Sequence, residues 1–228
     1  MCAKRPLFSG SAFEPMKSNE NSCSNWRLYV IVDAAASRDR DLAEIARAAI
    51  RGGADVIQLR AKFATSEQLR NQARRLLAVT RPSGVPLIIN DRPDIAADMG
   101  ADGVHLGQDD MPLAEARMRL PAGAILGKST HSFDQAIAAE KEGADYIGVG
   151  PIFATPTKPA YGKVGLPLIG QVAARVRIPF VCIGGIDAGN LKDVLAAGAR
   201  CAAVVRAVCG ADDPAAAAGA LKRLILPS

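Results

Sequence analysis

The chain has 228 residues, of which 49% are hydrophobic and 22% are charged, and it carries a formal net charge of +5. These values are typical of a globular protein that can bury one full core. The positive charge suits anionic metabolites or nucleic acid, but aromatic residues make up only 4% of the chain and no dense lysine and arginine tract occurs. We therefore expect small-molecule substrates and no nucleic-acid partner.

The first 25 residues differ from the rest of the chain. They are polar and lack the apolar core of a signal peptide, so we expect a disordered tail at 1–25 and a single domain at 26–228. No apolar run approaches the roughly 20 residues that span a bilayer, so we expect no membrane partner. The five cysteines show no metal-ligand spacing, which favours free thiols and a cytoplasmic location. A homo-oligomer is compatible with the sequence.

From residue 27 onward, short apolar segments typical of strands alternate with Ala-, Leu- and Arg-rich segments of helical periodicity. The expected strands are 27–32, 56–60, 87–90, 103–106, 124–127, 146–149, 180–183 and 202–205. The expected helices are 40–51, 67–79, 94–99, 112–120, 133–142, 167–175, 190–197 and 214–224. Strict alternation requires a parallel sheet with crossover helices. Eight such units in about 200 residues favour a closed (β/α)8 TIM barrel, an α/β fold, over an open sheet.

A short repeat supports closure of the barrel. Each copy follows an expected helix and precedes an even-numbered strand, and its glycine can end the helix in a left-handed conformation. The copies are Gly53-Ala54-Asp55, Gly100-Ala101-Asp102, Gly143-Ala144-Asp145 and Gly198-Ala199-Arg200. We assign these triplets to stability and no chemistry to them. Active sites of such barrels lie at the opposite face, where the strands end.

The end of the second strand carries a cluster of polar donors. In an extended segment Gln58, Arg60 and Lys62 project from one face, with Val56 below them. A planar arginine fork beside a compact lysine charge suits an anionic group such as a phosphate. The alternative is a pair of solvated cations at a strand end.

The ends of the sixth and seventh strands also suit an anion. The segment Thr155-Pro156-Thr157-Lys158 combines two hydroxyl groups with a cation, and Gly184-Gly185 permits close backbone approach to a ligand. Such barrels frequently hold phosphate at the loops after strands seven and eight, so we expect a phosphate site here. A tight turn would use two glycines equally well. His105 and His131 fit either substrate contacts or ordinary hydrogen bonds.

Carboxylates among these cations indicate a hard divalent metal. Asp91 directly follows an apolar strand, where an unpaired carboxylate would be costly to desolvate. Mg2+ takes one or two protein carboxylates and completes its shell with water and substrate phosphates. Asp109 and Asp110, at the end of the neighbouring strand, fit the second position equally well. The alternative is that Asp91 caps the helix that starts at Arg92-Pro93.

Six motifs, in this order and spacing, resemble the thiamine phosphate synthase family. The resemblance runs from about Leu28 to the C terminus, and six motifs in register are far more specific than any one of them. They are Gln58-Leu59-Arg60-x-Lys62, Asn90-Asp91, His105-Leu106-Gly107-Gln108-x-Asp110, Ser129-Thr130-His131, Gly150-Pro151-Ile152-Phe153-Ala154-Thr155-x-Thr157-Lys158 and Gly184-Gly185-Ile186.

The resemblance implies an Mg2+-dependent transferase that condenses 4-amino-5-hydroxymethyl-2-methylpyrimidine diphosphate with a phosphorylated hydroxyethyl-thiazole and releases diphosphate. It also implies roles for individual residues. The residues that would contact the pyrimidine diphosphate are Gln58, Leu59, Arg60, Ala61, Lys62, Asn90, Ser129 and Lys158. Those that would line the thiazole phosphate site are Thr155, Pro156, Thr157, Gly185, Val205 and Arg206. Asp91 and Asp110 would hold Mg2+, which resolves the tie at the fourth strand. Arg60, Lys62, Ser129 and Lys158 are the expected catalytic residues.

The family mechanism is dissociative, because the bond from carbon to diphosphate breaks before the thiazole nitrogen attacks. Two positions depart from the family pattern: Arg206 stands where many relatives have serine, and Ala61 where many have an acidic residue. Two other functions fit parts of the pattern. A thiazole tautomerase shares the barrel and the thiazole phosphate site but lacks the full diphosphate and metal set, and a non-catalytic sensor of phosphorylated metabolites would bind without turnover.

Overall fold

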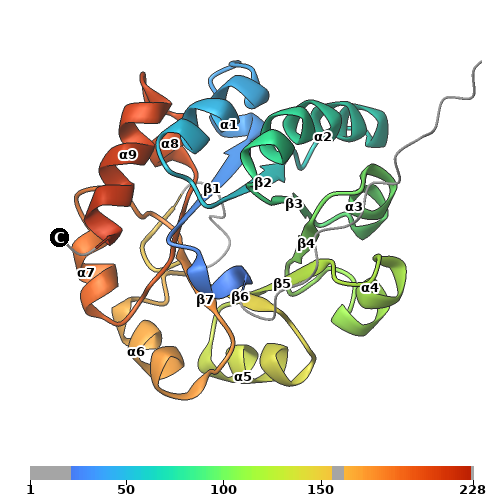
Figure 1. Cartoon of the computed structure of the whole chain (residues 1–228). Coiled ribbons are helices and arrows are strands. Elements are labelled where there is room, and N and C mark those ends of the chain that lie inside the picture. The colour runs from blue at the N-terminus through green and yellow to red at the C-terminus, as the bar shows by residue number, and fades with distance from the viewer. Residues whose placement is uncertain (1–21, 156–161, 227–228) are drawn as a thin grey trace, which may run out of the picture.

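The computed structural model describes residues 22–155 and 162–226. Eight parallel strands form a closed barrel in the order in which they occur along the chain, with helices around it (Figure 1). The strands are β1 (Leu28–Asp33), β2 (Val56–Arg60), β3 (Leu87–Asn90), β4 (Gly103–Leu106), β5 (Ile125–Thr130), β6 (Tyr146–Val149), β7 (Phe180–Ile183) and β8 (Ala202–Val204). This architecture confirms the expected (β/α)8 barrel.

The α-helices lie close to their expected positions. They are α1 (Leu42–Arg51), α2 (Ser66–Thr80), α3 (Pro93–Met99), α4 (Leu113–Arg119), α5 (Phe133–Lys141), α6 (Leu166–Arg175), α7 (Leu191–Ala196), α8 (Arg206–Cys209) and α9 (Pro214–Ile225). Among these, α8 was not expected, because four residues are too few to show helical periodicity. Short 3-10 helices occur at η1 (Ser22–Asn25), η2 (Ala34–Ala36) and η3 (Arg81–Ser83). Within the described ranges, no helix is long and apolar enough to cross a membrane.

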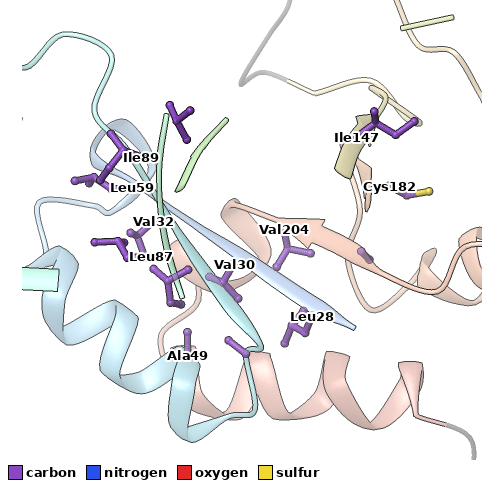
Figure 2. Packing of buried hydrophobic residues seen from close by; sticks show 14 of the residues in the cluster. Leu28, Val30, Val32, Ala49, Leu59, Leu87, Ile89, Ile147, Cys182 and Val204 are labelled. Carbon is purple, nitrogen blue, oxygen red and sulfur yellow. The ribbon is translucent and has the colours of Figure 1, made fainter. Parts of the chain in front are cut away.

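The outer face of the barrel packs against the helices. Side chains of every second strand residue point outward, as the two-residue period of a strand requires, and most of them are fully buried. Figure 2 shows part of this layer, with three side chains of β1 beside those of β2, β3 and β8. The labelled residues of that part are Leu28, Val30, Val32, Ala49, Leu59, Leu87, Ile89 and Val204.

The inner face of the barrel forms a second, smaller core. Trp26 lies directly before β1 and is buried, and its ring makes edge contacts with Tyr29 at 5.7 Å and with Tyr146 at 5.1 Å between ring centroids. Residues 22–25, which fall inside the expected tail, form η1 next to this core. The remaining residues of the tail predicted at 1–25 are 1–21, which lie outside the described ranges.

The repeated triplets close the barrel at the end where the strands begin. In three of them the aspartate accepts a backbone N–H from the start of an odd-numbered strand: Asp55 from Leu28 at 2.8 Å, Asp102 from Leu87 at 2.8 Å, and Asp145 from Leu126 at 2.7 Å. The triplet glycines have positive φ angles between 62° and 110°, so a left-handed residue ends each turn as expected. The aspartates are therefore structural acceptors.

We expect Asp55→Ala to lower the free energy of unfolding by about 2–4 kcal/mol. Asp55 accepts the N–H groups of Arg27 and Leu28 and also pairs with Lys222 of α9, so its removal leaves three partly buried donors without their partner. Urea denaturation followed by circular dichroism measures the change. Asp212→Ala is the matched control, because Asp212 pairs with Arg38 on an exposed surface, where such pairs contribute less than about 1 kcal/mol. Equal losses in the two variants would contradict this role.

Candidate active site

A cavity of about 480 Å3 lies where the strands end, as the barrel fold predicts. Side chains of the inner core form its apolar floor, among them Tyr29, Tyr146 and Val181. Polar groups from the strand ends surround it. Those expected from the sequence are Gln58, Arg60, Asn90, His105, Ser129, His131, Thr155, Gly185, Val205 and Arg206. The structure therefore brings these ten expected residues to one cavity, whereas Asp91 and Asp110 are not among its lining residues.

Arg60 is held in place by a carboxylate from the neighbouring strand. Its Nη1 donates to Oδ2 of Asp33, and the side chains of Arg60 and Asp33 are only 11% and 4% exposed. Asp33 lies at the end of β1, and its other carboxylate oxygen accepts the N–H of Ala35 at 2.8 Å. This bond uses one of the five N–H groups of Arg60 and leaves the other four for an anion.

The other residues of the second strand end divide between two places. Ala61 and Lys62 line a neighbouring hollow of about 440 Å3, which shares Arg60 with the main cavity and is bordered by the highly exposed Phe63. Leu59 points the opposite way and is fully buried between barrel and helices. A ligand can therefore meet Leu59 only through its backbone, whereas Arg60 can contact groups in either hollow.

A chain of side-chain hydrogen bonds crosses the floor of the cavity. Gln58 Nε2 donates to the Tyr29 hydroxyl at 2.8 Å, and the hydroxyls of Tyr29 and Tyr146 lie 2.9 Å apart. The Tyr146 hydroxyl lies 2.9 Å from Nδ1 of His105, and Nε2 of His105 lies 2.9 Å from Oγ of Ser129. Burial raises the pKa of both tyrosines well above the usual value, so both hydroxyls stay protonated.

The loop that carries Asp110 is fixed from two sides. Oδ2 of Asp110 accepts the N–H of Gly107 at 2.6 Å, which folds the loop back onto the end of β4. From β5, Lys128 Nζ donates to the carbonyl of Gly107 at 2.8 Å, and the carbonyl of Ser129 accepts from Gln108 Nε2 at 2.5 Å. These bonds hold the Asp110 carboxylate near the end of β4.

Asp91 occupies a backbone conformation that is rare for a residue with a side chain. Its φ is 63°, and its N–H donates to the carbonyl of His105 at 2.9 Å, so it lies beside the end of β4. Such strain is found mainly where surrounding structure or function requires it. The N-cap of α3 is Arg92, with no side-chain capping bond. The choice between a metal ligand and a helix cap for Asp91 therefore stays a prediction.

The two carboxylates suit a divalent cation with few protein ligands. Asp91 and Asp110 follow the neighbouring strands β3 and β4, whose pairing places Asn90 opposite His105. Within residues 22–155 and 162–226, no group of three or more His, Cys, Asp or Glu side chains is arranged to hold a metal. Two carboxylates are what Mg2+ uses when substrate phosphates and water complete its shell. The donor set therefore fits a metal that binds together with a phosphorylated substrate.

The glycine pair after β7 is required by close packing as well as by access to the cavity. Gly184 and Gly185 have φ angles of 104° and 63°, and a Cβ atom at Gly185 would lie 2.7 Å from the carbonyl oxygen of Ala154. Both glycines line the cavity beside Thr155 and Arg206. The pair therefore makes a tight turn at the cavity wall, and its contact with a ligand stays a prediction. Pro156, Thr157 and Lys158 lie outside the described residues.

The buried cysteines are unsuited to nucleophilic catalysis. Burial raises the pKa of the Cys182 thiol to about 12 and that of Cys209 to about 11, and it raises the pKa of Cys201 as well. Thiolates are the reactive form, and these groups remain thiols near neutral pH. All four cysteines of the described residues are free, as expected.

Three residues of the site were missed in the sequence. Asp33 ends the first strand, and a search of strand ends that begins at the first strand would have found it. Tyr29 and Tyr146 were counted as strand residues, although a hydroxyl that faces the inside of a barrel needs a hydrogen-bond partner. Their inward direction follows from the two-residue period, because Leu28 and Ile147 face outward.

Comparison with known proteins identifies close relatives. A family model described as thiamine monophosphate synthase matches residues 28–208. Thiamine-phosphate synthase of Chloroflexus aurantiacus is 51% identical over 202 residues, which cover 88% of this chain and 93% of that protein. The protein of the same name from Methanocella arvoryzae is 48% identical and covers 87% and 94%. Thiamine phosphate pyrophosphorylase from Pyrococcus furiosus has a matching structure, with a TM-score of 0.81 at 36% identity over 90% of this chain and 96% of that one.

Proposed function

The chain belongs to the thiamine monophosphate synthase family, and on this premise we propose that it makes thiamine phosphate from two phosphorylated precursors. The substrates are 4-amino-5-hydroxymethyl-2-methylpyrimidine diphosphate and 4-methyl-5-(2-phosphooxyethyl)thiazole, called here the pyrimidine diphosphate and the thiazole phosphate. In the reaction, the bond from the pyrimidine methylene carbon to the diphosphate oxygen breaks. A new bond forms from that carbon to the thiazole nitrogen, and diphosphate leaves.

One observation carries this proposal: donors for two anions lie around a single cavity with an apolar floor. Arg60 and Asn90 line it on the side of β2 and β3, whereas Thr155, Gly185 and Arg206 line it on the side of β6 to β8. Two phosphorylated substrates bound in this way would have their rings between the anion sites, above the tyrosines. This supports a reaction that joins two rings rather than one that acts on a single substrate.

The chain's own residues have defined tasks in this scheme. Arg60, with one N–H committed to Asp33, donates its remaining N–H groups to the diphosphate. Lys62 and Lys158 supply positive charge that offsets the negative charge of the leaving diphosphate. Binding the thiazole phosphate beside Gly185 and Arg206 holds its ring nitrogen toward the reacting carbon, so attack needs no further encounter in solution.

The cofactor that we propose is Mg2+, held by Asp91 and Asp110. When bound, it neutralises charge on the diphosphate oxygens as the carbon to oxygen bond weakens. The fixed loop of Asp110 and the strained backbone of Asp91 support this assignment, because the Asp110 carboxylate and the Asp91 backbone are both held beside the end of β4. The scheme is dissociative, so it requires charge neutralisation more than a general base.

A thiazole tautomerase would use the thiazole phosphate half of the site and leave the other half without purpose. The pairing of Arg60 with a buried Asp33 and the fixing of Asp110 by Lys128 and Gly107 support a use for the diphosphate half. We further propose a cytoplasmic location, which the free thiols support. The domain limits at 26–228 and a homo-oligomer stay predictions.

Complementation in cells tests the proposed function. The gene is expressed in a bacterial strain that lacks thiamine phosphate synthase, on medium without thiamine, with the Asp91→Asn variant as the matched negative control. We expect growth with the unmodified gene and none with the variant. No growth despite folded protein at a normal level would contradict the proposed function.

We expect Arg206→Ser to weaken apparent binding of the thiazole phosphate by about tenfold, the effect of one charge-assisted hydrogen bond. Arg206 starts α8, is exposed and lines the cavity beside Gly185, so its loss changes one anion site and not the other. Steady-state kinetics with each substrate varied in turn measure the change. An increase confined to the KM of the pyrimidine diphosphate would show that Arg206 acts in the diphosphate half of the site and that its assignment to the thiazole phosphate is wrong.

A further inference from the structure

The hydrogen-bonded chain on the cavity floor links two groups that face the ligand. Gln58 on β2 and Ser129 on β5 both line the cavity, and they are connected through Tyr29, Tyr146 and His105 by four contacts of 2.8–2.9 Å. The two tyrosines are only 2% and 1% exposed, so their hydroxyls are largely shielded from bulk water. The orientation of each proton in the chain is therefore set by the protein.

The barrel interior is shaped to make this chain. A Cβ atom at Gly127 would lie 2.3 Å from Cζ of Tyr146 and 2.5 Å from Nδ1 of His105, so only glycine leaves room for their contact. A Cβ atom at Gly148 of β6 would lie 3.3 Å from Cε1 of His105, a tight contact but less severe than those at Gly127. Trp26 packs against both tyrosine rings from the opposite end of the barrel.

Counting protons gives the chain a direction. Gln58 places Nε2, a donor, on the Tyr29 oxygen. Among residues 22–155 and 162–226, the single Tyr29 proton then has one acceptor within reach, the Tyr146 oxygen, and the Tyr146 proton must turn to Nδ1 of His105. In the reverse arrangement the Tyr146 proton would point at Tyr29, and the buried Tyr29 proton would have no acceptor unless the Gln58 amide turned over.

We propose that Tyr146, whose hydroxyl is oriented by Tyr29, is a positioning residue that donates to Nδ1 of His105 and so favours the tautomer with its proton on Nε2. His105 Nε2–H then donates to Oγ of Ser129. As a result, the Ser129 proton is directed away from His105 and toward the cavity. Gln58, which commits Nε2 to Tyr29, keeps Oε1 as its acceptor.

This arrangement deepens the proposed function and rests on it for the choice of ligand. The floor offers an acceptor on β2 and a hydroxyl donor on β5, which complements a heteroaromatic ring with an amino group and an anionic substituent. The amino group of the pyrimidine diphosphate would donate to Gln58 Oε1, and a diphosphate oxygen would accept from Ser129. A reversed chain would present an amide donor and a hydroxyl oxygen instead, and both contacts would be lost.

The tautomer can be measured directly, without substrate or turnover. The chain contains only two histidines, so protein labelled with nitrogen-15 histidine gives two imidazole spin systems, and His131→Gln assigns them. We expect the His105 spectrum at pH 7.5 to show a protonated Nε2 and an unprotonated Nδ1. A protonated Nδ1, in the other tautomer or in the imidazolium ion, would overturn the proposal, whereas failure of the synthase reaction would leave this measurement unaffected.

Two matched variants then distinguish the roles of the two tyrosines. Tyr146→Phe removes the donor to Nδ1, so we expect His105 to lose its preference for one tautomer and the KM for the pyrimidine diphosphate to rise about fivefold. Tyr29→Phe keeps that donor, so the tautomer should be retained while Gln58 loses its acceptor and the KM rises. A change of tautomer in Tyr29→Phe would show that the chain runs in the reverse direction.

Trp26→Phe is the control for packing. It alters the ring contacts of both tyrosines but removes none of the four hydrogen bonds. We expect the His105 nitrogen spectrum to stay unchanged in this variant. If Trp26→Phe and Tyr146→Phe disturbed the tautomer equally, the tyrosine hydroxyl would have only a packing role and the proposal would fail.

Discussion

Replacing Asp91 by asparagine is expected to reduce turnover by about 100-fold or more while the protein stays folded. The carboxylate is proposed to hold the metal that neutralises the leaving diphosphate, an effect worth several kcal/mol in comparable sites. Asparagine keeps the size of the side chain and is among the residues that tolerate a φ of 63°, so the backbone need not change. The measurement is kcat at saturating substrates, with circular dichroism as the check on folding.

The neighbouring aspartates supply the control for this experiment. Asp110 and Asp109 are adjacent in sequence, but the side chain of Asp110 is fixed by the N–H of Gly107 in the loop after β4. Asp110→Asn should therefore resemble Asp91→Asn, whereas Asp109→Asn should retain near-normal activity. Near-normal Mg2+-dependent turnover of Asp91→Asn would remove this residue from the metal site. Severe loss of turnover in Asp109→Asn but not in Asp110→Asn would show that Asp109 is the second ligand.

The second large effect is expected for Asp33→Asn, which should lower the free energy of unfolding by about 3–5 kcal/mol and also weaken binding of the diphosphate. The variant leaves the Arg60 guanidinium largely buried beside a neutral amide, so its charge loses the compensating carboxylate. Chemical denaturation measures the stability, and the KM for the pyrimidine diphosphate reports how well Arg60 stays in position.

An exposed ion pair provides the comparison for Asp33. Asp98 pairs with Arg70 at 2.7 Å, but the side chains are 53% and 40% exposed, so Asp98→Asn should change stability by less than about 1 kcal/mol. If Asp33→Asn were no more destabilising than Asp98→Asn and kept a normal KM, Asp33 would not be the residue that positions Arg60.

The barrel could be predicted because its signals are local and repeated. Each strand shows an apolar run, each helix shows its own period, and the glycine triplets mark the turns before even-numbered strands. Strand ends were less secure. β5 continues to Thr130 because Lys128, Ser129 and Thr130 pair with β6, and polar residues in a strand carry no apolar pattern to reveal them. The four-residue α8 was not predicted either, because it is too short to show helical periodicity.

The sequence predicted those parts of the candidate site that lie at the ends of single strands. Gln58, Asn90 and Arg206 were found because polar residues after buried strands meet at one face of a barrel. Direction beyond a strand end was not predictable, so Lys62 was expected beside Gln58 but lies at the neighbouring hollow. Partners across strands were also missed: Asp33 acts through Arg60, and Tyr29 is linked to His105 through Tyr146. Such contacts depend on the register between strands, which no single segment specifies.

The measurement that tests the central claim most directly is the stoichiometry of the proposed reaction. Purified protein is mixed with the pyrimidine diphosphate, the thiazole phosphate and Mg2+, and thiamine phosphate and released diphosphate are quantified over time, with EDTA in a parallel sample. We expect equal amounts of the two products and none of either with EDTA. Saturable binding of the thiazole phosphate with no product in the complete mixture would contradict a synthase and favour a tautomerase or a sensor.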